Sequence, residues 1–248
     1  MKILRTLADG HRRRQATLLR VLRNEYLREW DRYRSTAPGP RADRAWDAVV
    51  ARMVHRYGTA SAELAAAYYD EARHAAGVPG RFDVPVADPP PNGQVTASRA
   101  AVRRTSAPRP AEDDAGQWNR TLRDREIGAV QRLAAQAGRR TIEQAARADP
   151  QAVGWVRVIG PNCCAFCALL AVRGLVYADR TSATRTGTGD PYHDRCHCSA
   201  EPVFRGRSSD PEPHVAEWED LYYEASRDVW GDDKRRAFRR AFDAKYRA

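Results

Sequence analysis

The stretch Leu18-Leu-Arg-Val-Leu-Arg-Asn-Glu-Tyr-Leu-Arg-Glu-Trp-Asp-Arg-Tyr33 decides the fold class, because its apolar side chains recur every three or four residues. That spacing puts them on one face of an α-helix, opposite an Arg-rich face. The pattern extends over residues 3–34 and stops at Ser35-Thr-Ala-Pro-Gly-Pro40, whose prolines and glycine break helices. We therefore expect a long amphipathic helix here.

A second periodic segment, residues 42–76, follows this break. Its apolar stripe consists of Trp46, Val49, Val50, Met53, Tyr57, Leu64, Tyr68 and Ala72. Two long helices joined by a short Pro/Gly turn favour an antiparallel hairpin. We expect the aromatic residues of the pair to pack between the two helices and not to form a ligand site.

After the hairpin the pattern changes. Residues 77–116 read as a Pro-rich linker, with a brief helix over 97–104 and three successive prolines that exclude helix at 89–91. A third long helix is expected over 117–148, with Gly138 as a weak point. An alternating segment, 154–159, then predicts a strand.

The rest of the chain predicts short elements around the cysteines and two terminal helices. The short elements are a helix over 165–172 and strands over 174–177 and 198–204, and the terminal helices cover about 213–229 and 232–246. We expect the aromatic residues of these terminal helices to fold back onto the domain; docking on a partner is the alternative.

The fold class predicted is mainly α with a small α+β unit: a long N-terminal helical hairpin, a central helix, a small cysteine-rich sheet unit and C-terminal helices. The expected organisation has four parts. They are an N-terminal helical arm (1–76), the Pro-rich linker (77–116), a cysteine/histidine unit (117–204) and a C-terminal helical tail (205–248).

The chain has 248 residues and a net charge of +10, carried almost entirely by arginine. This balance favours contact with phosphate or acidic partners, although the codon usage of a GC-rich genome would give the same excess. The start of the chain turns polar too early for a signal peptide. The longest apolar run, Cys163 to Val172, is about half of a membrane span. We expect no membrane segment and synthesis in a reducing cytoplasm.

All five cysteines lie between Cys163 and Cys198, which is the clustering typical of a metal site in a reducing compartment. Two are spaced as in a knuckle turn, and two others are two residues apart, as on one side of a strand. The candidate ligands are Cys164, Cys167, His193, Cys196 and Cys198. Four cysteines, or a set in which His193 replaces one of the last two, would complete a tetrahedral zinc site.

A structural zinc ion is the preferred interpretation, because a unit with little apolar material gains folding energy from a metal crosslink. A thiol cluster packed as core and a catalytic or redox site are the alternatives. The chain contains no His-x-Glu, no H-E-x-x-H, no G-x-S-x-G and no phosphate loop. A zinc-dependent hydrolase would need Asp190, Asp194 or Glu201 as its acid or base.

Several short motifs follow one another in a fixed order. They are Gly138-Arg-Arg-Thr-Ile142, Gly154-Trp-Val-Arg-Val158, Cys164-Ala-Phe-Cys-Ala-Leu-Leu-Ala-Val-Arg-Gly174, Tyr192-His-Asp-Arg-Cys-His-Cys198 and Pro202-Val203. Over about residues 120–204, the chain resembles the MuF-like minor capsid (head morphogenesis) proteins of tailed phages, especially those of actinobacterial phages and prophages.

The resemblance implies a minor structural protein of a phage or prophage head, located inside the capsid near the portal after assembly in the host cytoplasm. Its implied partners are the portal protein, the major capsid or scaffold protein, and packaged DNA. For DNA, the candidate contacts are Arg12, Arg13, Arg14 and Arg173. Some relatives are labelled capsid maturation proteases. Because no catalytic constellation is found here, we expect a protein without enzymatic activity; the alternative is a capsid maturation protease or nuclease that uses zinc.

Overall fold

The computed structural model describes residues 2–35, 39–106, 115–159, 163–172, 194, 198–205 and 213–247. Its helices are α1 (Lys2–Arg34), α2 (Pro40–Ala75), α3 (Asn92–Thr105), α4 (Ala115–Ala148), α5 (Ala165–Val172), α6 (Pro213–Ala225) and α7 (Asp233–Tyr246). Its strands are β1 (Ala152–Val158) and β2 (Ser199–Phe204). The expected fold class, mainly α with a small α+β unit, is confirmed.

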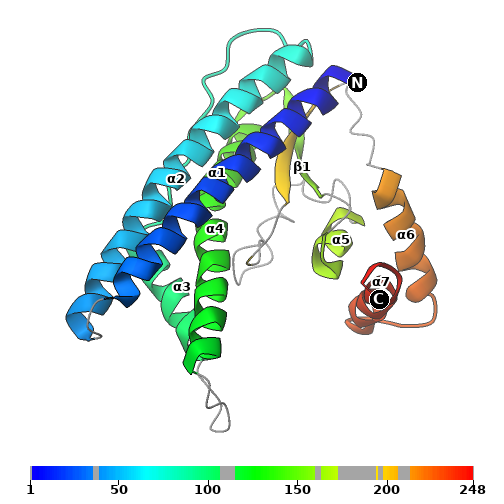
Figure 1. The fold of residues 1–248 in the computed structure, drawn as a ribbon. Coiled ribbons are helices and arrows are strands. Elements are labelled where there is room, and N and C mark those ends of the chain that lie inside the picture. Colours follow the sequence, from blue (N-terminus) through cyan, green and yellow to red (C-terminus); the bar gives the residue numbers. More distant parts are fainter. Residues whose placement is uncertain are drawn as a thin grey trace.

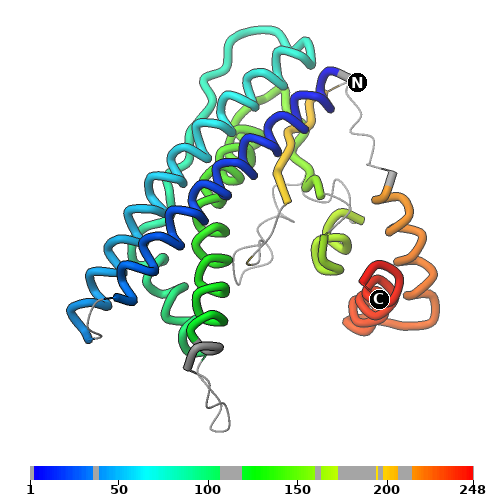
Figure 2. Tube along the Cα trace, viewed as in Figure 1, coloured from blue at the N-terminus to red at the C-terminus, as the bar shows by residue number. Residues whose placement is uncertain are grey.

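The molecule has two parts (Figure 1). The helices α1 and α2 form the expected antiparallel hairpin, and α3 and α4 pack against it; these four helices are called the helical body below. The short helices α5, α6 and α7 pack on one another at one side and are called the C-terminal lobe. Figure 2 traces the chain from the start of α1 in the helical body to the end of α7 in this lobe.

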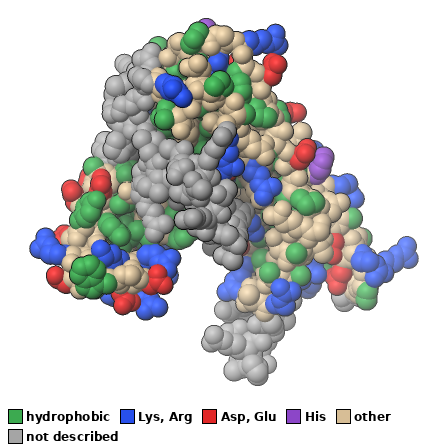
Figure 3. Space-filling model, turned by 180° about the vertical axis from the view of Figure 1, so that it is seen from behind, with side chains coloured by type: hydrophobic (Ala, Val, Ile, Leu, Met, Phe, Trp, Pro, Cys, Tyr) green, Lys and Arg blue, Asp and Glu red, His purple; other side chains and the backbone are tan. Residues whose placement is uncertain are grey.

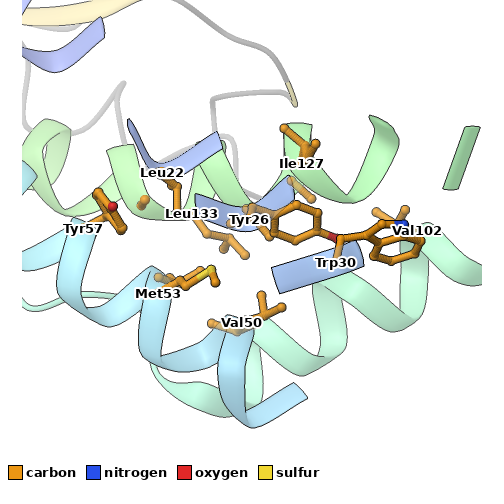
Figure 4. Packing of buried hydrophobic residues seen from close by; sticks show 14 of the residues in the cluster. Leu22, Tyr26, Trp30, Val50, Met53, Tyr57, Val102, Ile127 and Leu133 are labelled. Carbon is orange, nitrogen blue, oxygen red and sulfur yellow. The ribbon is translucent and has the colours of Figure 1, made fainter. Parts of the chain in front are cut away.

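The core of the helical body lies between α1, α2, α3 and α4 (Figure 4). Trp46 of α2 meets Tyr26 and Trp30 of α1 edge-on, with ring centroids 5.2 Å and 5.9 Å away. Such tilted pairs add to the stabilisation that burial gives. The aromatic residues of the hairpin therefore pack between its helices, as the sequence predicts.

A buried charge network crosses this core. Glu126 of α4 is fully buried, accepts a hydrogen bond from the Tyr26 hydroxyl at 2.6 Å and forms an ion pair with Arg99 of α3 at 3.3 Å. Arg99 is also buried and forms a second ion pair with Asp47 of α2. Burial lowers the pKa of Arg99, and the charge of Glu126 opposes that shift. The network thus connects all four helices of the body.

The segment expected as a linker packs on the helical body over much of its length. Helix α3 begins at Asn92, directly after three prolines, and contacts both α2 and α4. Before it, the backbone N–H of Ala87 donates to Thr141 Oγ1 of α4 at 3.0 Å. Residues 107–114 lie outside the described residues. The division into four parts stays a prediction.

Gly138 lies where α4 packs tightly against α2. A Cβ atom at this position would be 2.4 Å from Ser61 Oγ and 2.7 Å from the Ser61 carbonyl oxygen. By contrast, a Cβ at Gly10 of α1 would meet only the flexible end of Arg14, 3.6 Å away. Glycine is thus needed at one site for close packing, whereas the other site has room for a side chain.

We expect Gly138→Ala to lower the free energy of unfolding by about 1–3 kcal/mol, because the backbones of α2 and α4 must separate. The matched control Gly10→Ala should raise it by about 0.5–1 kcal/mol, since alanine is the better helix former. Urea denaturation followed by circular dichroism measures both values. A stabilising Gly138→Ala substitution would show that the two helices are not in close contact.

The two strands form an antiparallel sheet that packs on α4 and contacts α2. The register pairs Ala152 with Phe204 and Val158 with Ser199, with an irregularity before Gly154. Trp155 and Phe204 are buried with Tyr69 of α2 in a second core. The strand expected over 174–177 lies outside the described residues.

A buried histidine lies against the second core. His11 of α1 stacks on Tyr68 of α2, with ring centroids 4.5 Å apart. Burial, together with the neighbouring charges of Arg14 and Arg12, lowers the pKa of His11 to about 4. The neutral imidazole is therefore the form that fits the folded state.

Stability should consequently fall as the pH drops from about 6.5, where an unfolded histidine titrates, toward 4. Over that interval the unfolded state binds the proton and the folded state does not, at a cost of up to about 3 kcal/mol. Urea denaturation at pH 7 and pH 4.5 measures the loss. The variant His11→Phe, which keeps a stacked ring, should lose less stability over the same interval; an equal loss in both proteins would contradict the assignment.

A third core lies in the C-terminal lobe. Phe238 and Phe242 of α7 and Trp218 of α6 are buried against α5 together with Cys167 and Cys198. These C-terminal helices therefore fold back onto the domain. Two aromatic side chains do not take part, because Trp230 is 81% exposed and Tyr223 is 65% exposed.

Candidate metal centre at the cysteine cluster

The C-x-x-C turn forms the start of α5. The backbone N–H of Cys167 donates to Cys164 Sγ at 3.5 Å, which closes one turn at the N-terminus of the helix. The free N–H groups and the dipole at a helix start stabilise a negatively charged sulfur. This turn therefore brings both cysteines to the start of one helix.

Cys198, 31 positions after Cys167 in the chain, lies in the same core as the start of α5. It directly precedes β2, is buried, and belongs to the same core as Cys167. Its carbonyl oxygen accepts a hydrogen bond from Arg139 Nε of α4 at 3.1 Å. Helix α4 thus fixes the point at which the chain enters β2 and holds Cys198 near the start of α5.

Cys163 lies next to these residues and packs against the same core. Burial, together with the neighbouring sulfurs of Cys198 and Cys164, raises the pKa of Cys163 to about 12. The four cysteines in the described residues are free thiols.

The complete ligand set cannot be assembled from the described residues. Cys164, Cys167 and Cys198 lie in one core, but His193 and Cys196 fall outside the residues that the structure describes. Within the described ranges, no group of three or more His, Cys, Asp or Glu side chains is arranged to hold a metal ion. The identity of the four ligands, and the zinc ion itself, stay predictions.

The carboxylates that a hydrolase would need are engaged in ion pairs. Asp194 pairs with Arg132 Nε of α4 at 2.7 Å, and Glu201 pairs with Arg12 of α1 at 3.1 Å. Asp190 lies outside the described residues. A pocket next to Cys198, lined by α1, α4 and β2, has a volume of about 80 Å³. This volume is below the range of about 300–1,000 Å³ that is usual for ligand pockets. A second pocket, lined by Asp194 and by Thr121, Asp124 and Arg125 of α4, measures about 390 Å³ and falls within that range.

The candidate DNA-contact arginines are divided between internal and exposed positions. Arg12 joins α1 to β2 through Glu201 and also pairs with Asp9. Arg14 pairs with Glu71 of α2 at 3.4 Å, and Arg13 is exposed. Arg173 lies outside the described residues. Of the arginines in this set that the structure describes, Arg13 is exposed and can contact DNA without loss of the ion pairs named above.

One residue at the site was missed by sequence reasoning. Arg139 supports Cys198 from α4, 59 positions away in the chain. The signal was present, since Arg139 lies in the motif Gly138-Arg-Arg-Thr-Ile142, but the sequence did not indicate which part of the chain its side chain would contact.

The arrangement defines a mainly helical protein in which Cys167 and Cys198 are packed in the core of the C-terminal lobe. Residues 2–225 match the family model described as VG15 protein, which covers both the helical body and the cysteine unit. The chain therefore belongs to the VG15 family, and this membership indicates a phage virion-associated protein. No curated protein and no solved structure shows a significant match. None of the described helices is both long enough and apolar enough to cross a bilayer.

Proposed function

We propose that this chain is a minor structural protein of a tailed-phage or prophage head, of the MuF-like type, which lies inside the capsid near the portal and acts in head morphogenesis. The observation that carries the proposal is the family match over residues 2–225. The sequence motifs cover only the cysteine unit, whereas the family match also includes the helical arm before it. Both parts of the chain therefore belong to one phage-associated family.

We further propose that the protein has no catalytic role and that its cysteine cluster holds a structural zinc ion. Two features support this view. Cys167 and Cys198 belong to a packed core, and Asp194 and Glu201 are engaged in ion pairs. A zinc ion bound by thiolates from both sides would fasten the start of α5 to the start of β2, and its binding energy would add to the folding energy of the unit.

Mass spectrometry of purified virions and procapsids tests the location. We expect this chain in both, in few copies relative to the major capsid protein. Limited cross-linking of procapsids should join it to the portal protein. Absence of the chain from both kinds of particle would refute the proposal.

The absence of enzymatic activity is tested with Asp194→Asn in the phage or prophage genome. We expect head maturation and the processing of capsid proteins to stay at wild-type level, because the Asp194 carboxylate is engaged in an ion pair with Arg132. Gel analysis of assembled heads measures the outcome. Loss of processing, with the metal content of the purified variant unchanged, would instead favour the zinc-dependent hydrolase.

A further inference from the structure

The outer surface of the C-terminal lobe carries two opposite charges on two neighbouring helices. Helix α6 has four acidic residues and no lysine or arginine: Glu217, Glu219, Asp220 and Glu224. Helix α7 has six basic and two acidic residues, a net charge of +4; its basic residues are Lys234, Arg235, Arg236, Arg239, Arg240 and Lys245. The helices thus have charges of equal size and opposite sign.

These charges do not neutralise each other within the lobe. The contacts between α6 and α7 are aromatic, with Trp218 and Phe242 centroids 5.7 Å apart and Tyr222 and Phe238 centroids 5.8 Å apart. In the described part of the chain, no carboxylate of α6 forms an ion pair; Glu217 accepts only a long hydrogen bond, 3.5 Å, from the Tyr246 hydroxyl. The charged side chains of both helices therefore face solvent.

Helical spacing arranges these charges in rows. On α6, Asp220 and Glu224 are four residues apart and exposed, beside exposed Tyr223. On α7, Arg235 and Arg239 are four residues apart, with side chains 56% and 78% exposed. Residues four apart lie on one helix face. Both arginines also pair within their own segment, Arg235 with Asp232 at 2.6 Å and Arg239 with Asp243 at 3.7 Å. Exposed pairs of this kind are weak and exchange readily, so each helix still offers a row of one charge to a partner.

Two exposed aromatic side chains lie on the same lobe. Trp230, in the turn between the helices, is 81% exposed with Lys234 Nζ 5.5 Å from its ring centroid, and Tyr223 of α6 is 65% exposed. Figure 3 shows hydrophobic, basic and acidic side chains side by side on the lobe, at the left of that view. Tyrosine and tryptophan are enriched in protein interfaces and often dominate their energy.

The charge pattern argues against nucleic acid as the partner of this surface. Residues 213–247 contain eight acidic and eight basic residues, so the two helical segments together are neutral. Packed helices lie about 8–10 Å apart, close to the Debye length of about 8 Å at physiological salt. DNA approaching the arginines of α7 would therefore meet the carboxylates of α6, and a partner must instead match both charges at short range.

We propose that the partner is a second copy of this chain, which pairs lobe to lobe so that α6 of each copy lies against α7 of the other. A two-fold axis satisfies both contacts at once, because the interface of such a dimer uses the same surface twice. The acidic row of one copy then faces the basic row of the other, and Tyr223 and Trp230 are covered. The inference is independent of the location proposed above.

Sedimentation velocity of the full-length protein under reducing conditions tests the pairing. At about 50 mM salt we expect twice the monomer mass of 27.8 kDa, and at about 500 mM salt we expect the monomer, because salt screens the paired charges. A protein that stays monomeric at low salt and at about 100 µM, a concentration at which micromolar contacts are populated, would overturn the proposal.

Charge reversal gives the sharper test. One variant carries Glu219→Lys, Asp220→Lys and Glu224→Lys, which makes both helices basic; the other carries Arg235→Glu, Arg236→Glu and Arg239→Glu, which makes both acidic. Each alone should be monomeric at low salt, and an equimolar mixture should form a heterodimer. Failure of the mixture to pair, with both variants folded by circular dichroism, would overturn the two-fold arrangement.

Two controls separate the remaining explanations. The triple variant Arg5→Glu, Arg20→Glu and Arg23→Glu reverses three exposed charges on α1 and should leave the dimer intact. Trp230→Ser removes an exposed ring without changing a charge and should weaken dimerisation at least about tenfold, the effect of one interface aromatic. A monomeric wild type that binds duplex DNA through the α7 arginines would assign the surface to nucleic acid and refute the proposal.

Discussion

Replacing Glu126 with alanine is expected to lower the free energy of unfolding by about 3 kcal/mol, at the lower end of the range for breaking a buried ion pair. The substitution leaves the guanidinium of Arg99, which is 1% exposed, without its partner on α4 and removes the acceptor of the Tyr26 hydroxyl. Asp47 still faces Arg99, which keeps the loss from being larger. Urea denaturation followed by far-ultraviolet circular dichroism measures the change.

A matched control comes from the surface of α1. Glu29 pairs with Arg32, whose side chain is 74% exposed, so Glu29→Ala should change stability by less than about 0.5 kcal/mol. The comparison separates two contributions to the free energy of unfolding: the cost of leaving a buried charge without a partner, and the small cost of losing an exposed ion pair. If Glu126→Ala and Glu29→Ala had equal effects, the network between the four helices would not be closed to water.

The second large effect is expected at the cysteine cluster. In protein purified with zinc under reducing conditions, Cys167→Ser should abolish the bound metal and lower the melting temperature by about 10 °C, equivalent to about 3 kcal/mol for a domain of this size. The reason is that Cys167 is 2% exposed and shares the turn with Cys164, so a lost ligand cannot be replaced by water from outside. Metal analysis and calorimetry give the two measurements.

Cys163→Ser is the control for this substitution, because it changes a neighbouring thiol that is not among the candidate ligands. We expect one zinc per chain in both the wild type and this control. Wild-type protein without metal, or a control that loses metal while Cys167→Ser keeps it, would remove the basis for a structural zinc ion.

The helices were predictable because their apolar residues recur over many turns. The expected ranges 3–34 and 117–148 match Lys2–Arg34 and Ala115–Ala148 to within two residues at each end. The sequence predicts a helix over 97–104, whereas α3 starts at Asn92. The prediction misses the first turn because Asn92-Gly93 has the composition of a turn. The proline before Asn92 nevertheless suits the start of a helix. The terminal helix expected to reach 229 ends at Ala225.

Contacts between distant segments were not predictable in the same way. A pattern indicates which face of a helix is apolar, but it does not indicate that Arg99 of α3 would meet Glu126 of α4 inside the core. Gly138 was expected to weaken α4, whereas its position against Ser61 gives it a packing role that only the neighbouring helix reveals. At the candidate site, the C-x-x-C spacing is enough to predict that Cys164 and Cys167 lie in one turn. The hydrogen bond from Arg139 to the Cys198 carbonyl is visible only in the three-dimensional fold.

The third core has a consequence for the order in which the protein is made. Among the described residues, the core of the helical body includes none beyond position 134, so it can close while the ribosome is still translating the cysteine unit. The core around Cys167 and Cys198, by contrast, includes Phe238 and Phe242. The cysteines therefore stay open to the solution until residue 242 has been synthesised, and this interval is when a metal ion has its easiest access to them.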